Sequence, residues 1–449
     1  MTDADIATFA SALDERVVEI TERCTQCGKC FEACPMTEPV GIADADPGAV
    51  LGGVIDLLKG GEGNATARRW ADVCTRSGFC IPACDDGVNA RFMMGMTKLA
   101  MKRRDHDNET LARAATDSFR AMTRGVRMLS RLQMPPETLS RVNPRPSRKP
   151  PTTAPDVVFY TGCNILRTPH IALLCLDILD RLGVSYEVKG GTSTCCGIFQ
   201  FNAGDADASG RVAFNSIDQL ASAGTAEVLA WCPSCQTQMS EITLPAFQRL
   251  REQTPFELTP FLVFLARNLD RLRPLMTHRV EKRVALNERP AVPEAMAAVK
   301  TILAAIPGLE FVDLDVRRIG NMSNYLSVLP AFKTELRAAE FKAASEAGVT
   351  TLATVYHACH RELCHYEKDV SFEIVNFMEL LGESMGLQSP DIYKRLKIMQ
   401  DVDAMITDAS DLVARHDLDL EDLRAVLYAD MLGAATPAAS SDSRSRPSA

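Results

Sequence analysis

Residues 157–197 read VVFYTGCNILRTPHIALLCLDILDRLGVSYEVKGGTSTCCG and predict a strand, a helix and a second strand in succession. A helix at GRVAFNSIDQLASAG and a strand at EVLAW continue the pattern, which favours a parallel sheet with crossover connections. Cysteines follow each predicted strand: Cys163, then the pair Cys195 and Cys196, then Cys232 with Cys235. Because open parallel sheets bind ligands at the carboxyl ends of their strands, we expect these thiols to converge there. We call them the five-thiol site.

A second unit with the same order of elements follows the first. It reads RVAL at 283–286, a helix at PEAMAAVKTILAAIPG, a strand at EFVDL, a helix at AFKTELRAAEFKAASEAG and a strand at TLATVY. The spacings agree as well, since Gly197 precedes Cys235 by 38 positions and Gly320 precedes Cys359 by 39. The sequence therefore predicts a tandem duplication.

The second copy is degenerate, because Arg318 and Ile319 stand where the cysteine pair stands in the first copy. Its segment VYHACHRELCHYE keeps a group of possible ligands, namely His357, Cys359, His360, Cys364 and His365. Such a set could bind zinc or iron, or it could be a remnant loop that lines the pocket of the first copy. His357 or His360 could also donate protons near the five-thiol site, since histidine titrates close to neutral pH.

The composition is that of an ordinary globular protein. Of 449 residues, 46% are hydrophobic and 24% are charged, and 49 basic against 58 acidic side chains give a net charge of −9. The chain lacks the basic surplus of a nucleic-acid binder, and no apolar run approaches the length of a membrane span. The acidic N-terminus does not resemble a signal peptide, so we expect a cytoplasmic protein, at most peripheral to the inner face of the membrane. Fifteen cysteines are many for that compartment unless they bind metal or carry redox chemistry.

Seven of the cysteines lie in two loops near the N-terminus, among predicted helices. The first loop is Cys24-x2-Cys27-x2-Cys30-x3-Cys34 followed by proline. This spacing is typical of a ferredoxin, in which three thiolates bind one [4Fe-4S] cluster and the fourth binds another. A zinc site or a disulfide fits less well, because zinc sites favour paired Cys-x2-Cys elements. The helical surroundings predict a helical ferredoxin.

The second loop, CTRSGFCIPACDD, has Ser77 where the second cysteine of such a loop would stand. By the crossed ligation of two-cluster ferredoxins, the loops exchange one cysteine each. This gives a first thiol set of Cys24, Cys27, Cys30 and Cys84, and a second thiol set of Cys34, Cys74 and Cys80. Three thiolates suit a [3Fe-4S] cluster; a hydroxyl from Ser77, a carboxylate from Asp85 or a water could instead hold a fourth iron.

The five-thiol site offers one thiolate more than the four of a cubane cluster, and adjacent cysteines do not easily chelate one metal. We therefore expect an unusual cluster there. The alternative is a group of buried thiols with one zinc ion.

The succession TGC, CCG and CPSC at these intervals resembles the cysteine-rich CCG domain of heterodisulfide reductase subunits. The resemblance covers nearly the whole chain, which looks like a fusion of the ferredoxin-type subunit with the catalytic subunit. Similar fusions occur in the iron–sulfur subunits of glycolate, lactate and anaerobic glycerol-3-phosphate oxidising enzymes. The resemblance implies that the five-thiol site binds a noncubane [4Fe-4S] cluster at which a disulfide is reduced, with Cys163, Cys195 and Cys196 as catalytic residues. The related catalytic subunit has two such motifs, whereas this chain has one intact.

These patterns predict an α+β multidomain protein. Seven prolines between residues 135 and 155 exclude a continuous helix and favour an extended linker. We expect a helical ferredoxin-like two-cluster domain at 1–132, this linker at 133–155, the intact CCG domain at 156–260, its degenerate repeat at 261–390, a helical extension at 391–433 and a disordered tail at 434–449.

Two functional hypotheses follow. In the first, ferredoxin clusters pass electrons to a noncubane site that reduces a disulfide or related sulfur bond of a substrate or carrier protein. In the second, all clusters form a relay between a flavin-dependent dehydrogenase for a small organic acid or amine and a quinone or soluble carrier. No phosphate-binding glycine motif follows a predicted strand, so a separate flavoprotein subunit is the expected partner in both cases.

Overall fold

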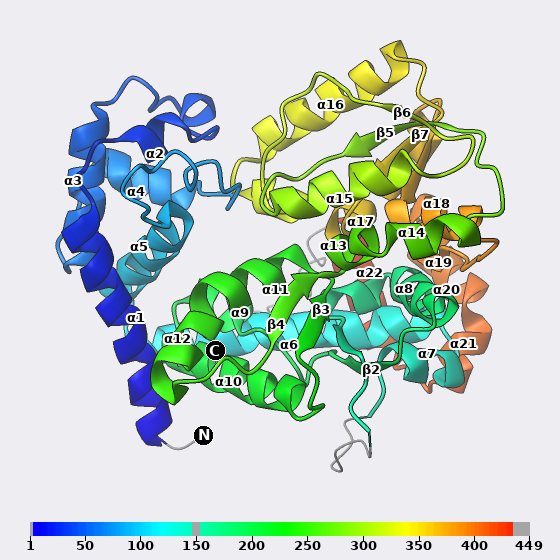
Figure 1. Ribbon diagram of the computed structural model, residues 1–449, viewed down its shortest axis with the longest axis horizontal. Coiled ribbons are helices and arrows are strands. Elements are labelled where there is room, and N and C mark those ends of the chain that lie inside the picture. The colour runs from blue at the N-terminus through cyan, green and yellow to red at the C-terminus, as the bar shows by residue number, and fades with distance from the viewer. Residues whose placement is uncertain (1–2, 146–152, 434–449) are drawn as a thin grey trace, which may run out of the picture.

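The computed structural model describes residues 3–145 and 153–433 of the chain (Figure 1). They form a helical N-terminal unit, two four-stranded parallel sheets surrounded by helices, and a C-terminal group of short helices. This agrees with the predicted combination of helix and sheet. Among the described residues, no helix is long and apolar enough to cross a membrane.

Three helices of the N-terminal unit begin at a side chain that caps their free N–H groups. Asp46, Asn64 and Asn89 each accept a hydrogen bond from the backbone N–H three residues further on. The small core of the unit contains Phe31 and Trp70, which pack edge to face with ring centroids 5.2 Å apart. The helices are α1 (Asp3–Arg23), α2 (Lys29–Glu32), α3 (Pro47–Leu58), α4 (Ala65–Asp72) and α5 (Ala90–Asp105).

A long helix, α6 (Asn108–Gln133), runs from this unit along the first sheet unit (Figure 1). Met122 and Val126 on α6 belong to the same apolar core as Ile165, and the helix packs along α9 (Ile198–Ala203). Although the sequence placed this helix in the ferredoxin-like domain, its packing joins it to the sheet unit.

Part of the predicted linker is helical. Helix α7 (Pro136–Val142) begins at Pro136, which is tolerated in a first helical turn because its missing N–H would have no partner there. Arg141 ties α7 to the next helix through Asp177 and Asp180, at 2.9 and 3.1 Å. The expectation of extended chain was therefore wrong for this stretch, and residues 146–152 of the linker lie outside the described residues.

The first sheet has the strand order β2-β1-β3-β4, with all neighbours parallel. Its inner strand β1 is buried at every residue, whereas the edge strand β2 is half-buried throughout. The strands are β1 (Val157–Tyr160), β2 (Tyr186–Lys189), β3 (Glu227–Ala230) and β4 (Glu257–Pro260), and the further helices are α8 (Pro169–Leu182), α10 (Ala206–Ala221), α11 (Pro233–Gln238), α12 (Leu244–Arg251), α13 (Phe261–Arg267) and α14 (Leu269–Leu272).

The second sheet repeats the first in strand order and direction. Its order is β6-β5-β7-β8, again with all neighbours parallel. Each element expected in the second copy is present, and the fourth strand of each sheet is an addition to the expectation. The elements are β5 (Arg283–Asn287), α15 (Pro293–Leu303), β6 (Glu310–Val312), α16 (Pro330–Glu346), β7 (Thr351–Thr354), α17 (His357–Leu363), β8 (Glu373–Asn376) and α18 (Phe377–Ser384).

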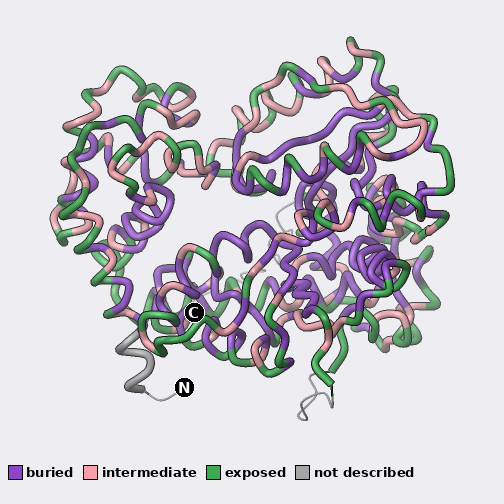
Figure 2. Tube along the Cα trace, in the orientation of Figure 1, coloured by how far each residue is buried: buried purple, intermediate pink, exposed green. Residues whose placement is uncertain are grey.

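The region expected to be a helical extension consists of α19 (Ile392–Met399), α20 (Val402–Asp408), α21 (Ser410–Arg415) and α22 (Leu420–Leu427). These helices share a separate apolar core with α6, in which Leu129 and Leu132 meet Tyr393 and Leu423. Figure 2 shows buried residues concentrated in the strands and in the helices between the two sheets. The expected tail at 434–449 lies outside the described residues.

Candidate functional site

The two cysteine loops of the N-terminal unit have the same backbone conformation. Gln26 and Gly28 in the first loop have φ values of 57° and 82°, and Arg76 and Gly78 in the second have 58° and 89°. These left-handed residues turn the chain sharply between successive cysteine positions. At Gly28 a side chain is also excluded by space, because a Cβ there would lie 2.1 Å from the Cβ of Pro47.

The structure brings the first thiol set together. Burial raises the pKa of Cys30 to about 12, and the neighbouring Cys24, Cys84 and Cys27 contribute to the shift. Burial also raises the pKa of Cys24, with Cys84 and Cys27 again close by. Cys84 reaches this group from the second loop and accepts a hydrogen bond from Val88 N at 3.3 Å.

The second thiol set is also assembled from both loops. Burial raises the pKa of the Cys80 thiol, and the neighbouring Cys74 and Cys34 add to the shift. Burial raises the pKa of Cys34 too, against the opposing effect of the nearby Trp70 indole. A cation lies next to this set, since Lys98 Nζ donates to Cys74 O at 3.2 Å. The loops thus exchange Cys34 and Cys84 in the way that crossed ligation requires.

Ser77 and Asp85, the two side chains considered as a fourth ligand, have different surroundings. Ser77 is buried, and its Oγ accepts a hydrogen bond from Gly320 N at 2.8 Å and lies 2.9 Å from Thr75 Oγ1. Asp85 is exposed and its carboxylate forms an ion pair with Lys29. The carboxylate is therefore engaged at the surface, while the hydroxyl joins the second loop to the second sheet unit.

The five-thiol site lies at the carboxyl edge of the first sheet, and its cysteines are at most 6% exposed. The thiols are neighbours in the order Cys163, Cys195, Cys196, Cys235 and Cys232, and each affects the pKa of the next. The neighbouring thiols of Cys195 and Cys235 lower the pKa of Cys196 to about 6. Five thiols in mutual contact and away from water form a soft, electron-rich donor set.

Backbone packing behind the thiols fixes their loops. Gly197, which follows the cysteine pair, has φ of 80°, and a Cβ there would lie 2.6 Å from Ser209 O. Ser209 Oγ donates to Gly197 O at 3.0 Å, and Ser216 Oγ donates to Cys195 O at 2.7 Å. At Gly162, with φ of 67°, a Cβ would lie 3.1 Å from the Sγ of Cys235. A side chain at Gly197 would therefore clash with the backbone of α10, and one at Gly162 would press against the thiol of Cys235.

A cavity of about 740 Å³ joins the five-thiol site to the N-terminal unit. Four of the five cysteines line it, and the second thiol set contributes Cys74. The segment Ser323–Val328 of the second sheet unit closes the cavity on another side, where Tyr325 Oη lies 3.1 Å from Ser234 Oγ. Its polar lining includes Arg76, Lys98, Asn164, Ser234, Asn324, Tyr325 and His357.

His357, expected near the five-thiol site, lines this cavity from the start of α17. It is 1% exposed, and its Nδ1 has no hydrogen-bond partner among the described residues. Burial lowers the pKa of its imidazole well below the ordinary value, and the cations Arg361 and Arg167 lower it further. The imidazole is therefore neutral near pH 7 and carries one N–H.

The equivalent edge of the second sheet holds charged side chains in place of thiols. Arg289 follows β5 and is buried; its guanidinium donates to Ile319 O at 3.1 Å and to Ser323 Oγ at 2.9 Å. Glu340 is also buried there and accepts two hydrogen bonds from Asn287 Nδ2, at 2.8 and 2.6 Å. The second sheet thus lacks the cysteine pair, and buried charged side chains occupy the corresponding edge.

The histidines and cysteines of VYHACHRELCHYE do not gather into one group. Cys359 lies next to Arg289, and Cys364 is buried in the core shared with the C-terminal helices. His360 has a different partner, because its Nε2 lies 2.6 Å from Asp391 Oδ2. Among the described residues the alternative of a shared metal set in this segment has no support, because helix α17 sends successive residues to different surroundings.

The sequence did not indicate several residues that line the cavity or lie beside an expected site residue. Arg76, Lys98 and Tyr325 line the cavity, and His170 is among the partners of His360. None belongs to a motif of its own. Arg76 and Lys98 lie close in sequence to the second cysteine loop, which is the only sequence signal that could have indicated them.

The donor sets fit iron–sulfur clusters. Thiolates are the ligands that such clusters use, and both the first thiol set and the five-thiol site supply at least four of them. Burial raises the pKa of Cys30 and of Cys80, so a positively charged group such as cluster iron would favour the thiolate forms of these two residues.

The model of the CCG cysteine-rich domain family matches residues 157–240. This range contains all five cysteines of the five-thiol site and the strands β1, β2 and β3. A search of curated proteins found no match to the chain. The chain therefore contains a CCG cysteine-rich domain, which supports an iron–sulfur or redox role for the five-thiol site.

Proposed function

We propose that the chain is the iron–sulfur subunit of a cytoplasmic oxidoreductase complex that reduces a disulfide or a related sulfur bond. In this proposal the N-terminal unit holds a [4Fe-4S] cluster on the first thiol set and a [3Fe-4S] cluster on the second, and the five-thiol site holds a noncubane [4Fe-4S] cluster. The observation that carries the proposal is the cavity that Cys74 shares with Cys163, Cys196, Cys232 and Cys235. When bound, the clusters would supply one-electron transfer.

The exposure of the cysteines supports electron transfer from the surface of the protein toward its interior. Cys27 of the first thiol set is exposed, the second set is half-buried, and the five-thiol site is buried. A flavoprotein partner would therefore reach the first set, and the substrate would enter the cavity beside the five thiols. The repeated strand order of the two sheets supports the inference that they arose by duplication.

The cavity residues would bind the sulfur substrate and supply protons. Two electrons and two protons convert one disulfide into two thiols, so a partner of the flavoprotein class must provide the electron pair. Polar side chains at Ser234, Asn324 and Tyr325 can orient a small substrate, and the neutral His357 holds a proton at the cavity wall.

A relay function is the second candidate, and the second sheet edge favours it. Arg289 and Glu340 occupy the place where a second five-thiol site would lie, so the chain has one such site rather than the pair on which the related two-site cleavage depends. In this case the cavity would bind a quinone or meet a soluble carrier, and the flavoprotein would oxidise a small organic acid or amine.

One experiment separates the two candidates. Anaerobic holoprotein is reduced with viologen dye and mixed with cystine, glutathione disulfide or a quinone analogue, and thiol release is measured beside cluster reoxidation. Sulfur chemistry predicts thiol release that Cys196→Ser abolishes and Cys175→Ser keeps, because Cys175 is buried on α8 outside the five-thiol site. Reoxidation by the quinone alone, without thiol release, would instead establish the relay.

A further inference from the structure

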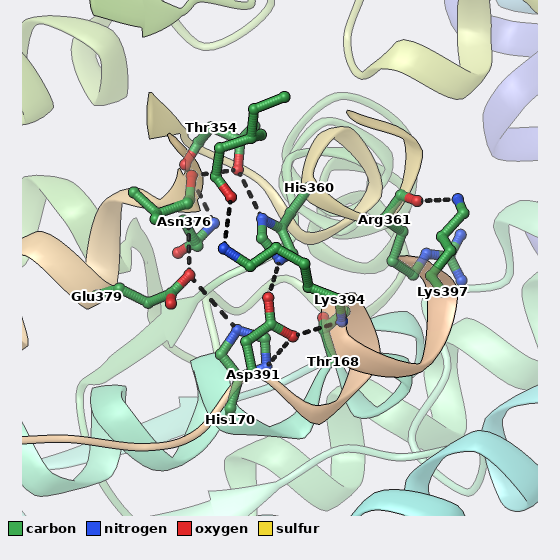
Figure 3. Close-up of polar contacts among 12 residues, drawn as sticks. Thr168, His170, Thr354, His360, Arg361, Asn376, Glu379, Asp391, Lys394 and Lys397 are labelled. Atoms are coloured by element: carbon green, nitrogen blue, oxygen red, sulfur yellow. Dashed lines mark hydrogen bonds and ion pairs between the residues drawn. The ribbon is translucent and has the colours of Figure 1, made fainter. Parts of the chain in front are cut away.

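A compact group of two buried histidines and two half-buried carboxylate residues lies where three parts of the chain meet (Figure 3). It contains His170 on α8, His360 on α17, Glu379 on α18 and Asp391, which caps α19. One possible ligand atom from each residue lies within 4.8 Å of the others. We call this group the histidine–carboxylate cluster; it is separate from all three thiol groups.

The side chains of the cluster point toward one another (Figure 3). His360 Nε2 lies 2.6 Å from Asp391 Oδ2, and His170 Nδ1 lies 3.5 Å from Asp391 Oδ1. His170 Nε2 lies 3.8 Å from Glu379 Oε1. The side chains of His170, His360 and Asp391 are 1%, 0% and 5% exposed, so water does not satisfy them freely.

Of the four residues in the cluster, His170 is the one whose ring nitrogens lack hydrogen-bond partners. Neither of its ring nitrogens makes a hydrogen bond among the described residues, although the imidazole is almost completely buried. An imidazole left in this state loses about 1–3 kcal/mol relative to one whose nitrogens are bonded. Each nitrogen faces a carboxylate at a distance too long for a hydrogen bond, and one ion bound to either nitrogen would leave the other as an N–H donor to the carboxylate beside it.

A divalent cation would balance the charges of the cluster, as would protonation of both imidazoles. Two carboxylates carry two negative charges, and a single protonated imidazole would leave one of them uncompensated in a buried site. A cation of charge +2 with two neutral imidazoles brings the sum to zero. Lys394, the nearest lysine on α19, is already bonded to Glu367 Oε2 at 2.9 Å and to Ile374 O at 3.2 Å.

We propose that the histidine–carboxylate cluster binds one structural zinc ion through His170, His360, Glu379 and Asp391. Four protein ligands without an open position are typical of a structural zinc site. With zinc–ligand bonds of about 2.0–2.1 Å, tetrahedral ligand atoms lie roughly 3.3 Å apart. One ligand atom from each of the four residues lies within 4.8 Å of the others, so inward side-chain movements of roughly 1–2 Å bring them to that separation.

Neighbouring groups already orient the side chains of the cluster through hydrogen bonds and short polar contacts. His360 Nδ1 lies 3.4 Å from Thr354 Oγ1, which in turn donates to Val375 O at 3.1 Å. Glu379 Oε1 accepts from Asn376 N at 2.7 Å, and the Asp391 carboxylate accepts from Lys394 N at 2.9 Å. Contacts of this kind fix imidazole orientation and carboxylate position before metal binds.

The site would join the first sheet unit, the second sheet unit and the C-terminal helices. His170 follows the Cys163 loop on α8, and His360 lies one turn after His357 on α17. Zinc would therefore hold α17, and with it His357, in a fixed position relative to the five-thiol site.

The test measures zinc and iron in anaerobically purified holoprotein and records the zinc K-edge X-ray absorption spectrum of the same sample. We expect about one zinc per chain, bound only by nitrogen and oxygen at about 2.0–2.1 Å. Zinc content should fall to about zero in His170→Gln and His360→Asn, while iron content stays unchanged. His278→Gln, an exposed histidine of the second unit, should keep its zinc.

Two outcomes would overturn the zinc site. A sulfur shell at about 2.3 Å would place the zinc in a cysteine group instead. Wild-type protein without zinc, from cells grown with added zinc, would leave the cluster as an ion-pair network. The absorption spectrum does not depend on the folding of any variant, and the iron content reports separately on the proposed electron-transfer function.

Discussion

Replacing Ser77 tests whether the second cluster has three irons, because the Ser77 hydroxyl is bonded to the backbone and could also be the ligand of a fourth iron. Ser77 Oγ accepts from Gly320 N at 2.8 Å and lies 2.9 Å from Thr75 Oγ1. In Ser77→Ala both interactions disappear, and the buried Gly320 N–H loses its acceptor. In Ser77→Cys a thiolate stands at the position that Cys27 occupies in the first loop.

The expected loss of stability in Ser77→Ala follows from the Gly320 N–H, which loses its acceptor. A buried donor left without a partner costs about 1–3 kcal/mol. For a unit of roughly 150–250 residues, each kcal/mol lowers the melting temperature by about 2–4 °C, so Ser77→Ala should melt about 2–12 °C lower. Ser384→Ala is the matched control, because Ser384 is a buried serine on α18 whose hydroxyl donates to Leu381 O within its own helix.

The assay combines iron analysis with electron paramagnetic resonance and differential scanning calorimetry. Wild type and Ser77→Ala should both hold about 11 irons per chain and keep a three-iron signal. Ser77→Cys should hold about 12 and replace that signal with one from a four-iron cluster. If Ser77→Ala instead loses about one iron while the control does not, the hydroxyl is an iron ligand and the three-iron assignment is wrong.

Three further changes test other parts of the structure. Arg91→Met leaves the half-buried carboxylate of Glu241 without its partner, bonded at 2.9 Å through Arg91 Nε, and should lower the free energy of unfolding by about 3 kcal/mol in denaturant titrations; recovery in the double variant with Glu241→Gln is the check on that cause. Gly197→Ala should remove the iron of the five-thiol site, because a Cβ there would lie 2.6 Å from a backbone oxygen. Gly183→Ala is the control, because Gly183 has a similar φ of 62° but open space around it. This control should lower the free energy of unfolding by only about 1–2 kcal/mol and keep all its iron. Lys98→Met removes the cation bonded next to the second thiol set, so a redox titration should find that cluster harder to reduce; an unchanged potential would contradict this electrostatic role.

Apolar runs predicted the strands well, because inner strands of a parallel sheet are buried on both faces. VVFY and EVLAW gave β1 and β3, and TLATVY gave β7. The outer strands β4 (Glu257–Pro260) and β8 (Glu373–Asn376) were missed, since each has four residues and an exposed acidic residue at its start. Helix α7 was missed because its prolines read as linker, although proline is favoured in a first helical turn.

The cysteine sites could be predicted because their residues follow short sequence motifs, while the cavity and the histidine–carboxylate cluster could not. The cavity depends on how Cys74 of the N-terminal unit docks near Cys232 and Tyr325, which no local pattern encodes. The cluster combines His170 with Asp391, far apart in the sequence and on different units. Only the folded arrangement brings such residues within ligand distance.

The most direct test of the central claim is a redox titration of anaerobically purified holoprotein by electron paramagnetic resonance, with iron measured on the same sample. We expect three separable signals and about 11 irons per chain, from one three-iron and two four-iron clusters. Two signals with about seven irons would show that the five-thiol site holds no cluster, which would contradict the proposed path from the N-terminal unit to the CCG domain.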